Sequence, residues 1–204
     1  MSEDVYRICL MGTQGTGKSA LAGSVAGLLK ERGVESIALG EKSQAARKIG
    51  LNINEETDAG SQLWILHQTF ADVIDHSVRR PGCDFSVIIS DRGPDNYCYL
   101  KKAHGEDIYA LGMVIGHMQR FPYSRSYLLP IVDTEIAENN VRSSDKDFQE
   151  TMDRHIRRFL HDQRMEYVEL PQPQKDDTFR NEWKKIIINK TLSDLNHPEK
   201  YFIK

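Results

Sequence analysis

The sequence predicts a protein of the α/β class, in which helices cover both faces of a parallel β-sheet. Short apolar runs of the length of buried strands alternate along the chain with longer stretches in which apolar residues recur at helical spacing. In addition, a glycine-rich segment separates the first apolar run from the first helical stretch. This is the order of strand, loop and helix in such a sheet.

The composition fits one globular domain that spans residues 1–204. A chain of 204 residues can bury a core that needs no disulfide or structural metal. Its hydrophobic content of 39% and charged content of 28% are typical of globular proteins. The formal net charge of -3 argues against nonspecific binding of long nucleic acid, although a local basic face is compatible with it.

Cysteine usage and the N-terminus favour a cytoplasmic location. Cys9, Cys83 and Cys98 are odd in number and lack C-x-x-C spacing, so neither a disulfide framework nor a zinc site is expected. Residues 1–4 end with two neighbouring acidic side chains, whereas a signal peptide would begin with basic residues and continue with apolar ones. No apolar run approaches the ~20 residues that cross a bilayer, so we expect no membrane partner.

The first strand is expected at residues 6–11, where six mostly apolar residues follow one another. The helix after the glycine-rich segment ends near Gly33, which suits a helix C-terminus. Its apolar face is formed by Leu21, Val25, Leu28 and Leu29. Gly23 and Gly27 lower helix propensity, and we expect them to allow close packing of this helix on the sheet.

The glycine-rich segment fits the pattern G-x-x-x-x-G-K-[ST] of the phosphate-binding P-loop. Its residues are Gly12, Thr13, Gln14, Gly15, Thr16, Gly17, Lys18 and Ser19. In such a loop the backbone N–H groups surround the phosphates, the lysine reaches the terminal phosphates, and the serine hydroxyl binds Mg²⁺. The segment therefore predicts a site for ATP and Mg²⁺.

The second strand is expected at residues 36–39 and leads to Glu41. This places a carboxylate at the edge where ligands bind in open parallel sheets. Residues 45–54 are polar and contain a glycine, so we expect them to be irregular. A helix over 61–76 follows from its apolar periodicity, and the proline and glycine at 81–82 close it.

The third strand, expected at residues 85–89, leads directly to Asp91 and Arg92. A carboxylate at the end of a buried strand can hold Mg²⁺ or its waters opposite the Ser19 hydroxyl. The arginine places a permanent cation beside the phosphates, where negative charge spreads over oxygens during transfer. We therefore predict catalytic roles for both residues.

The rest of the chain continues the alternation of helices and strands. The expected elements are one helical stretch over 97–115, strands over 126–131 and 167–171, a helix over 145–164, and a last helix around Trp183. Tyr97 and Tyr99 in the first of these are assigned to the core in preference to a base pocket.

The expected helix over 145–164 has one apolar and one basic face. Arg154, Arg157 and Arg158 lie opposite the apolar residues, either as a solvated face or as part of a lid that closes over phosphates. A lid would exclude water from the reaction. Arg142 precedes the helix and is the better lid residue, because a helix N-terminus also favours anions. The lid region would span about residues 139–164.

Together these motifs resemble the P-loop kinases of the AAA-type ATPase/kinase family related to ribosylnicotinamide kinase, which includes phage-encoded nucleotide-kinase-like proteins. Beyond the P-loop, the resemblance rests on three segments in the same order, residues 52–66, 91–99 and 141–148. It covers roughly residues 5–170.

The resemblance implies a P-loop NTPase fold, a three-layer αβα sandwich whose five parallel strands have the order 2-3-1-4-5. It implies roles at the phosphates, the metal and the acceptor. Lys18 would bind the transferring phosphate, Ser19 and Asp91 would bind Mg²⁺, Arg92 and Arg142 would contact phosphates, and Gln62, Asp95 and Arg47 would face the acceptor. In many relatives an acidic residue lies three positions before the arginine that matches Arg47. Glu41 lies six positions before it, so Ser43 and Gln44 are alternatives for that place.

The expected function is a Mg²⁺- and ATP-dependent phosphotransferase acting on a nucleoside, a nucleotide or a related small molecule. If the acceptor is a hydroxyl, Glu41 or Asp91 would take its proton, whereas a phosphate acceptor needs no base. Two alternatives remain open at this point: a kinase that phosphorylates a modified base in DNA, and an ATP-binding regulatory module.

Overall fold

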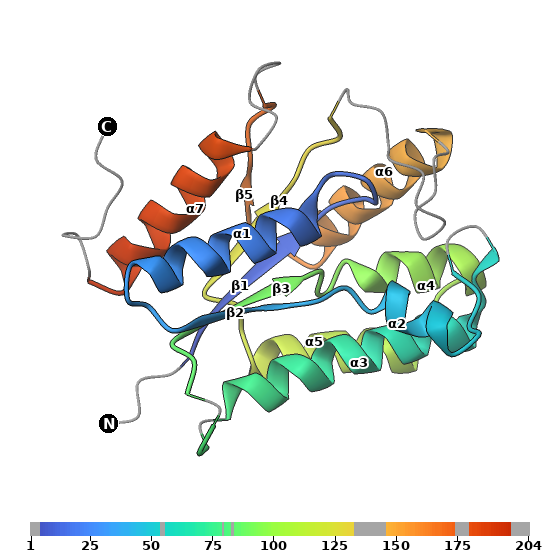
Figure 1. The fold of residues 1–204 in the computed structure, drawn as a ribbon. Helices are drawn as coiled ribbons and strands as arrows, with labels where there is room; N and C mark the ends of the chain where they lie inside the picture. The colour runs from blue at the N-terminus through green and yellow to red at the C-terminus, as the bar shows by residue number, and fades with distance from the viewer. Residues whose placement is uncertain are drawn as a thin grey trace.

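The computed structural model of the protein contains a parallel sheet between two layers of helices (Figure 1). The structure describes residues 5–53, 56–78, 80–82, 84–132, 146–173 and 180–196. Within these ranges, five parallel strands have the order β2-β3-β1-β4-β5, which confirms the predicted sheet. The strands are β1 (Tyr6–Met11), β2 (Ser36–Leu39), β3 (Val87–Asp91), β4 (Arg125–Leu128) and β5 (Val168–Glu169).

Each face of the sheet has its own apolar core. On one face, α1 (Lys18–Glu31) and α7 (Asn181–Asp194) pack against the strands, and Trp183 of α7 is fully buried there. The opposite core contains residues of four other helices. These are α3 (Ala59–Ser77), α4 (Asn96–His104), α5 (Ile108–Arg120) and α6 (Lys146–Asp162). Among the residues that the structure describes, no helix has the length and apolar character needed to cross a bilayer.

The strand register determines where the polar strand ends lie. The third strand runs two residues further than predicted, so Asp91 is its last residue and pairs with Leu10 of β1. The P-loop leaves β1 only one residue later. The neighbouring strand β2 ends at Leu39, two positions before Glu41. The sheet thus brings Glu41, Asp91 and the P-loop to one edge.

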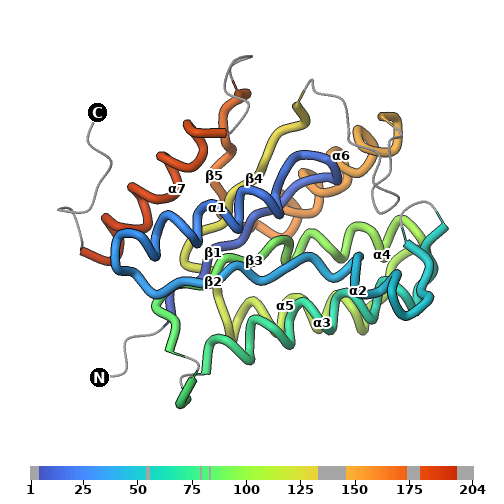
Figure 2. Tube along the Cα trace, in the orientation of Figure 1, coloured from blue at the N-terminus to red at the C-terminus, as the bar shows by residue number. Residues whose placement is uncertain are grey.

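Two segments differ from the sequence expectation. Residues expected to be irregular form a short helix, α2 (Ser43–Lys48), which lies beside α3 (Figure 2). The single helical stretch expected after β3 is two helices, because Gly105 ends α4 with a φ of 90°. Asp107 then begins α5, where its side chain accepts a hydrogen bond of 2.9 Å from the N–H of Ala110. A glycine after the first helix and an aspartate before the second are the residue types that commonly end and begin helices.

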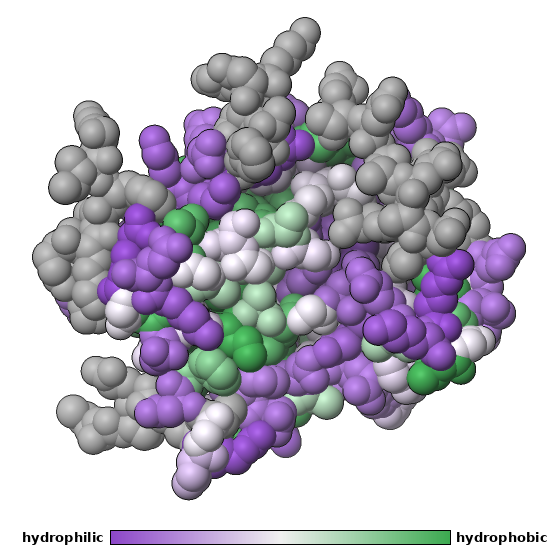
Figure 3. Space-filling model, in the orientation of Figure 1, coloured by the Kyte–Doolittle hydropathy of each residue, from purple (hydrophilic) through white to green (hydrophobic). Residues whose placement is uncertain are grey.

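The expected packing role of Gly23 and Gly27 is wrong. Both lie on the exposed side of α1, and a Cβ atom at either position would meet nothing within 4 Å. Figure 3 shows weakly hydrophobic and neutral side chains over α1, as its sequence of small residues implies. The glycines therefore lower helix propensity with no packing contact in return.

His117 of α5 is expected to make the stability of the protein depend on pH. Its ring stacks on Phe70, with 4.0 Å between ring centroids, and is 8% exposed. Burial, helped by the charge of Arg7, lowers the pKa of His117 from 6.5 to about 4. Between pH 6.5 and 4, His117 is therefore protonated in the unfolded chain but mostly neutral in the folded chain. The free energy of unfolding falls as pH drops through this range, by on the order of 2 kcal/mol.

Denaturant unfolding of the wild type and of His117→Phe at pH 7, 6, 5 and 4 measures this effect. The phenylalanine variant keeps the stacked ring and removes the titrating group, so its stability should fall less between pH 6.5 and 4. Parallel pH profiles of the two proteins would show that His117 does not contribute.

Candidate active site

The P-loop has the backbone conformation that its glycines predict. Gly12, Gly15 and Gly17 have φ angles of 134°, 77° and 89°, which favour glycine. At Gly12 a Cβ atom would also lie 2.9 Å from the carbonyl oxygen of Leu129, so this position excludes any side chain. Gly17 precedes α1, whose N-terminal N–H groups and dipole favour a bound anion at the loop.

Lys18 lies within the loop and is only 5% exposed. Its Nζ donates to the carbonyl oxygen of Thr13 over 2.5 Å and to Oγ1 of Thr16 over 3.1 Å. Burial, and after it the charge of Arg92, lowers the pKa of Lys18 to about 8, although nearby carboxylates oppose this shift. An ammonium group held only by neutral oxygens gains stability from a phosphate anion, so the loop is prepared for one.

Asp91 provides the site with a buried carboxylate. It is 4% exposed, and neither carboxylate oxygen has a hydrogen-bond partner of good geometry among the described residues. Burial and the charge of Glu41 raise the pKa of Asp91, while Lys18, the Ser19 hydroxyl and Arg92 act in the opposite direction. A dry carboxylate with open lone pairs, next to a serine hydroxyl, suits a hard cation such as Mg²⁺.

The remaining ligands of such a cation would come from phosphates and water. Among the described residues, no group of three or more His, Cys, Asp or Glu side chains could hold a metal ion. Mg²⁺ commonly binds through one or two carboxylates together with substrate phosphates. The donor set of Ser19 and Asp91 fits this mode of binding.

Arg92 lies at the centre of the site and is 4% exposed. Its Nε is 3.3 Å from Oε1 of Glu41, its Nη1 donates to the carbonyl oxygen of Gly12 over 3.4 Å, and its guanidinium lies 4.5 Å from the ring centre of Tyr99. Burial alone lowers the pKa of Arg92, but Tyr99 and the carboxylates outweigh it and raise the pKa, so the charge is permanent.

The backbone at Arg92 is strained, with a φ of 82°. A non-glycine residue in this region costs about 1–3 kcal/mol, which the surrounding contacts must offset. The next residue, Gly93, is restricted for another reason: a Cβ atom there would lie 2.6 Å from Sγ of Cys9. The turn after β3 is thus held tightly against β1, and this keeps the guanidinium in the site.

Asp95, which the resemblance places towards the acceptor, lies beneath the pocket surface, so that role stays a prediction. Its side chain is fully buried and does not line the pocket at this edge. Its carboxylate accepts hydrogen bonds from the N–H of Gly93 over 2.8 Å and of Gly12 over 3.3 Å, and it lies 3.7 Å from Nη1 of Arg92. Asp95 therefore joins the P-loop to the turn after β3.

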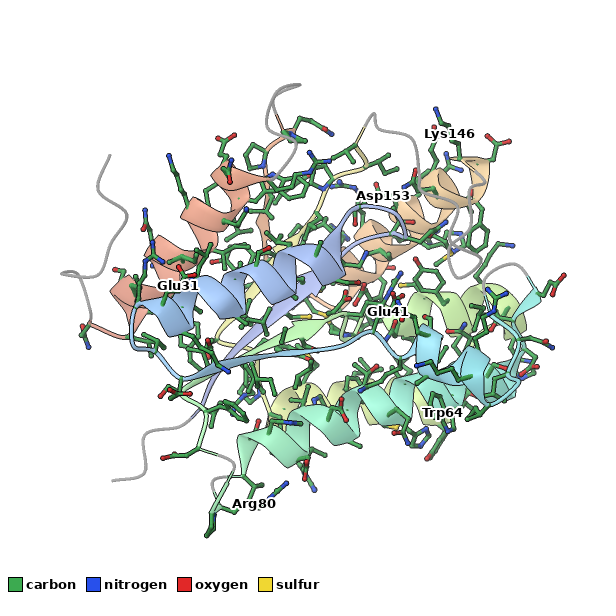
Figure 4. All side chains as sticks on the ribbon, in the orientation of Figure 1. Glu31, Glu41, Trp64, Arg80, Lys146 and Asp153 are labelled. Atoms are coloured by element: carbon green, nitrogen blue, oxygen red, sulfur yellow. The ribbon has the colours of Figure 1, made fainter. Side chains whose placement is uncertain are left out.

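A pocket lies between the P-loop, the end of β2, α3 and α4. Figure 4 labels Glu41, one of the residues that line it. Of the predicted acceptor residues, Gln62 lines it, and its Nε2 donates to Oγ1 of Thr57 over 2.8 Å. Glu41 and Ser43 line it too, whereas Arg47 is exposed on α2 and is not brought into the pocket. Arg142 lies outside the described residues, so its role in a lid stays a prediction.

Sequence reasoning missed two pocket residues on α4, Asn96 and Tyr99. Tyr99 was assigned to the core, and it does belong to the apolar core, yet its ring also faces Arg92. The signal for both was present in the sequence, because they follow the Asp-Arg segment by a few residues and so begin the next helix at the same edge.

The fold and the site together define a P-loop protein with the sheet order of nucleoside and nucleotide kinases. The AAA_28 family, described as an AAA domain, matches residues 7–177, and the chain belongs to this family. No curated protein matches the sequence.

Solved structures confirm the fold. NadR in complex with NR superimposes with a TM-score of 0.66 at 13% identity, over 93% of this chain and 51% of NadR. NadR with NAD and AMP-PNP gives 0.65 at 12% identity, over 98% and 51%. The chain thus spans about half the length of NadR. Deoxyadenosine kinase from M. mycoides, with the products dCMP and dCDP, gives 0.57 at 15% identity, over 92% and 99%.

Proposed function

We propose that the protein is a Mg²⁺- and ATP-dependent kinase that transfers a phosphoryl group to a nucleoside, a nucleotide or a related small molecule. The observation that carries this proposal is the convergence of two half-sites at one sheet edge. Lys18 and Ser19 suit the phosphates and the metal and line the same pocket as Glu41 and Gln62. The Asp91 carboxylate lies beside the Ser19 hydroxyl. The resemblance to kinase structures supports the same class of reaction.

Catalysis would rest on positioning and on charge stabilisation rather than on covalent chemistry of the protein. Lys18 would bind the transferring phosphate in place of its present loop acceptors. Arg92, held by Glu41 and stacked on Tyr99, would stabilise the charge that spreads over the phosphoryl oxygens. Mg²⁺, when bound by Ser19 and Asp91, would neutralise charge on the donor phosphates.

Glu41 is the better of the two candidate bases. Asp91 lies beside the Ser19 hydroxyl and suits the metal, whereas Glu41 lines the pocket. The Ser43 hydroxyl donates to Oε1 of Glu41 over 3.1 Å, and Arg92 contacts the same oxygen. These contacts hold the carboxylate in a fixed orientation, so it is placed to take the proton of an acceptor hydroxyl.

The geometry favours a small acceptor over DNA. Arg157 on the basic face of α6 is bound by Asp153 at 2.6 Å and by Glu169 at 2.8 Å, and Arg158 lies 3.6 Å from Asp162. These pairs reduce the positive charge that this face offers to DNA phosphates.

Replacing Glu41 with glutamine is expected to lower kcat for a hydroxyl acceptor by about 100- to 10,000-fold, because the amide cannot take the proton. Affinity for Mg²⁺-ATP should change little. Glu31→Gln, at the far end of α1 (Figure 4), makes the same chemical change at an exposed position and should leave kcat unaltered. Steady-state kinetics of the three proteins measures this. An unchanged kcat in Glu41→Gln would show that Glu41 is not the base.

A further inference from the structure

The side chain of Gln14, the third residue of the P-loop, contains a buried donor that the fold does not use. The residue is 6% exposed and lines the pocket. Its Nε2 has no hydrogen-bond partner among the described residues. Buried polar groups in folded proteins almost always have a partner, so an unpaired N–H pair beside a ligand pocket indicates a donor kept for a ligand.

Two hydroxyl groups fix the orientation of this amide. The Thr13 hydroxyl donates to Oε1 of Gln14 over 2.6 Å, and the Tyr99 hydroxyl donates to the same oxygen over 3.0 Å. Because both donors occupy the oxygen, the NH₂ group is turned away from them. The backbone is held as well, since Nε2 of Gln149 in α6 donates to the carbonyl oxygen of Gln14 over 2.7 Å.

The surroundings of the amide indicate an anionic oxygen as its partner. Lys18 and Arg92, the two buried cations of the site, line the same pocket. Gln14 belongs to the loop whose pattern and conformation suit phosphates, and Tyr99 connects it to the guanidinium of Arg92. A preorientated neutral donor that shares a pocket with two cations complements the oxygens of a phosphoryl group.

We propose that the Gln14 amide donates a hydrogen bond to an oxygen of the phosphoryl group while it is being transferred. This inference rests on the proposed kinase function. In the transfer, the bond from the γ-phosphorus to the bridging oxygen of ADP breaks and a bond to the acceptor oxygen forms. The acceptor proton goes to Glu41, and ADP leaves with the bridging electron pair. Gln14 exchanges no proton, and its contribution is to charge stabilisation alone.

The test compares binding of Mg²⁺-ADP with binding of Mg²⁺-ADP and aluminium fluoride, which mimics the phosphoryl group in transfer. Gln14→Met keeps the length of the side chain and removes the donor. We expect it to weaken the aluminium fluoride complex by about 100-fold, while affinity for Mg²⁺-ADP stays within about 3-fold. Gln14→Glu should weaken the complex at least as strongly, because it brings a negative charge towards the anion.

Gln119→Met on the exposed side of α5 is the matched control and should bind both ligands as the wild type does. Thermal unfolding of each variant establishes that it is folded. Tyr99→Phe removes one of the two orienting hydroxyls and should lower the affinity for the aluminium fluoride complex less than Gln14→Met does. Equal affinity of wild type and Gln14→Met for the aluminium fluoride complex would overturn the inference. So would a wild type that gains no affinity from aluminium fluoride. A wild type that forms the complex but phosphorylates no acceptor would instead contradict the proposed function.

Discussion

Replacing Lys18 with alanine is expected to reduce phosphoryl transfer by at least about 1000-fold while the protein stays folded. The ammonium group is the charge in the P-loop that can approach the transferring phosphate, and the site is dry enough for that charge to act strongly. The fold should tolerate the change, because burial already lowers the pKa of Lys18 and its loop acceptors are neutral oxygens.

Lys30→Ala, near the exposed end of α1, is the matched control for Lys18→Ala and should retain full activity. Initial rates of both variants with saturating Mg²⁺-ATP, together with their thermal unfolding curves, give the comparison. Activity close to that of the wild type in Lys18→Ala would show that the phosphate site has been placed wrongly.

Replacing Asp91 with asparagine is expected to lower turnover by about 100- to 1000-fold and to raise the Mg²⁺ concentration needed for activity. The variant keeps the shape of the side chain and loses the charge that a cation needs. The carboxylate lies at the end of β3, beside the Ser19 hydroxyl, and neither of its oxygens has a hydrogen-bond partner of good geometry among the described residues. A Mg²⁺ titration of initial rates measures the effect, and an unchanged titration curve would contradict a metal role.

The same substitution is expected to stabilise the metal-free protein at neutral pH. The folded pKa of Asp91 lies above its unfolded value of about 3.9, so the folded chain binds the proton more tightly. The free energy of unfolding therefore falls as pH rises through these two pKa values. At pH 7 the ionised carboxylate destabilises the folded state. A higher melting temperature for Asp91→Asn than for the wild type, without Mg²⁺, would show that the buried charge at this functional position lowers the stability of the fold.

Local patterns predicted the parallel sheet, and the resemblance supplied its strand order, which the structure confirms. The P-loop is contiguous in sequence, and the parallel strands bring their C-terminal ends to one edge, so Lys18, Asp91 and Glu41 could be placed near one another before the fold was known. Arg92 could be assigned to the same edge, but its positive φ and its stacking on Tyr99 depend on tertiary packing.

The tertiary contacts that hold the site together were harder to predict because they join distant parts of the chain. Asp95 bonds to Gly12, 83 positions away, and Gln149 bonds to Gln14, 135 positions away. No local pattern encodes such pairs. Arg47 was placed from the resemblance, and the unpredicted helix α2 turns it to the surface. The break between α4 and α5 was visible as Gly105 and Asp107 but was overridden by the apolar periodicity that continues across it.

The measurement that tests the kinase proposal most directly is the fate of the γ-phosphate of labelled ATP. The wild type is incubated with Mg²⁺ and panels of nucleosides, nucleoside monophosphates and hydroxymethylated DNA, and the products are separated and identified by mass spectrometry. We expect the label to appear on a free nucleoside or nucleotide, and we expect Lys18→Ala to abolish this product. Label on DNA alone, or only as inorganic phosphate with every acceptor, would contradict it.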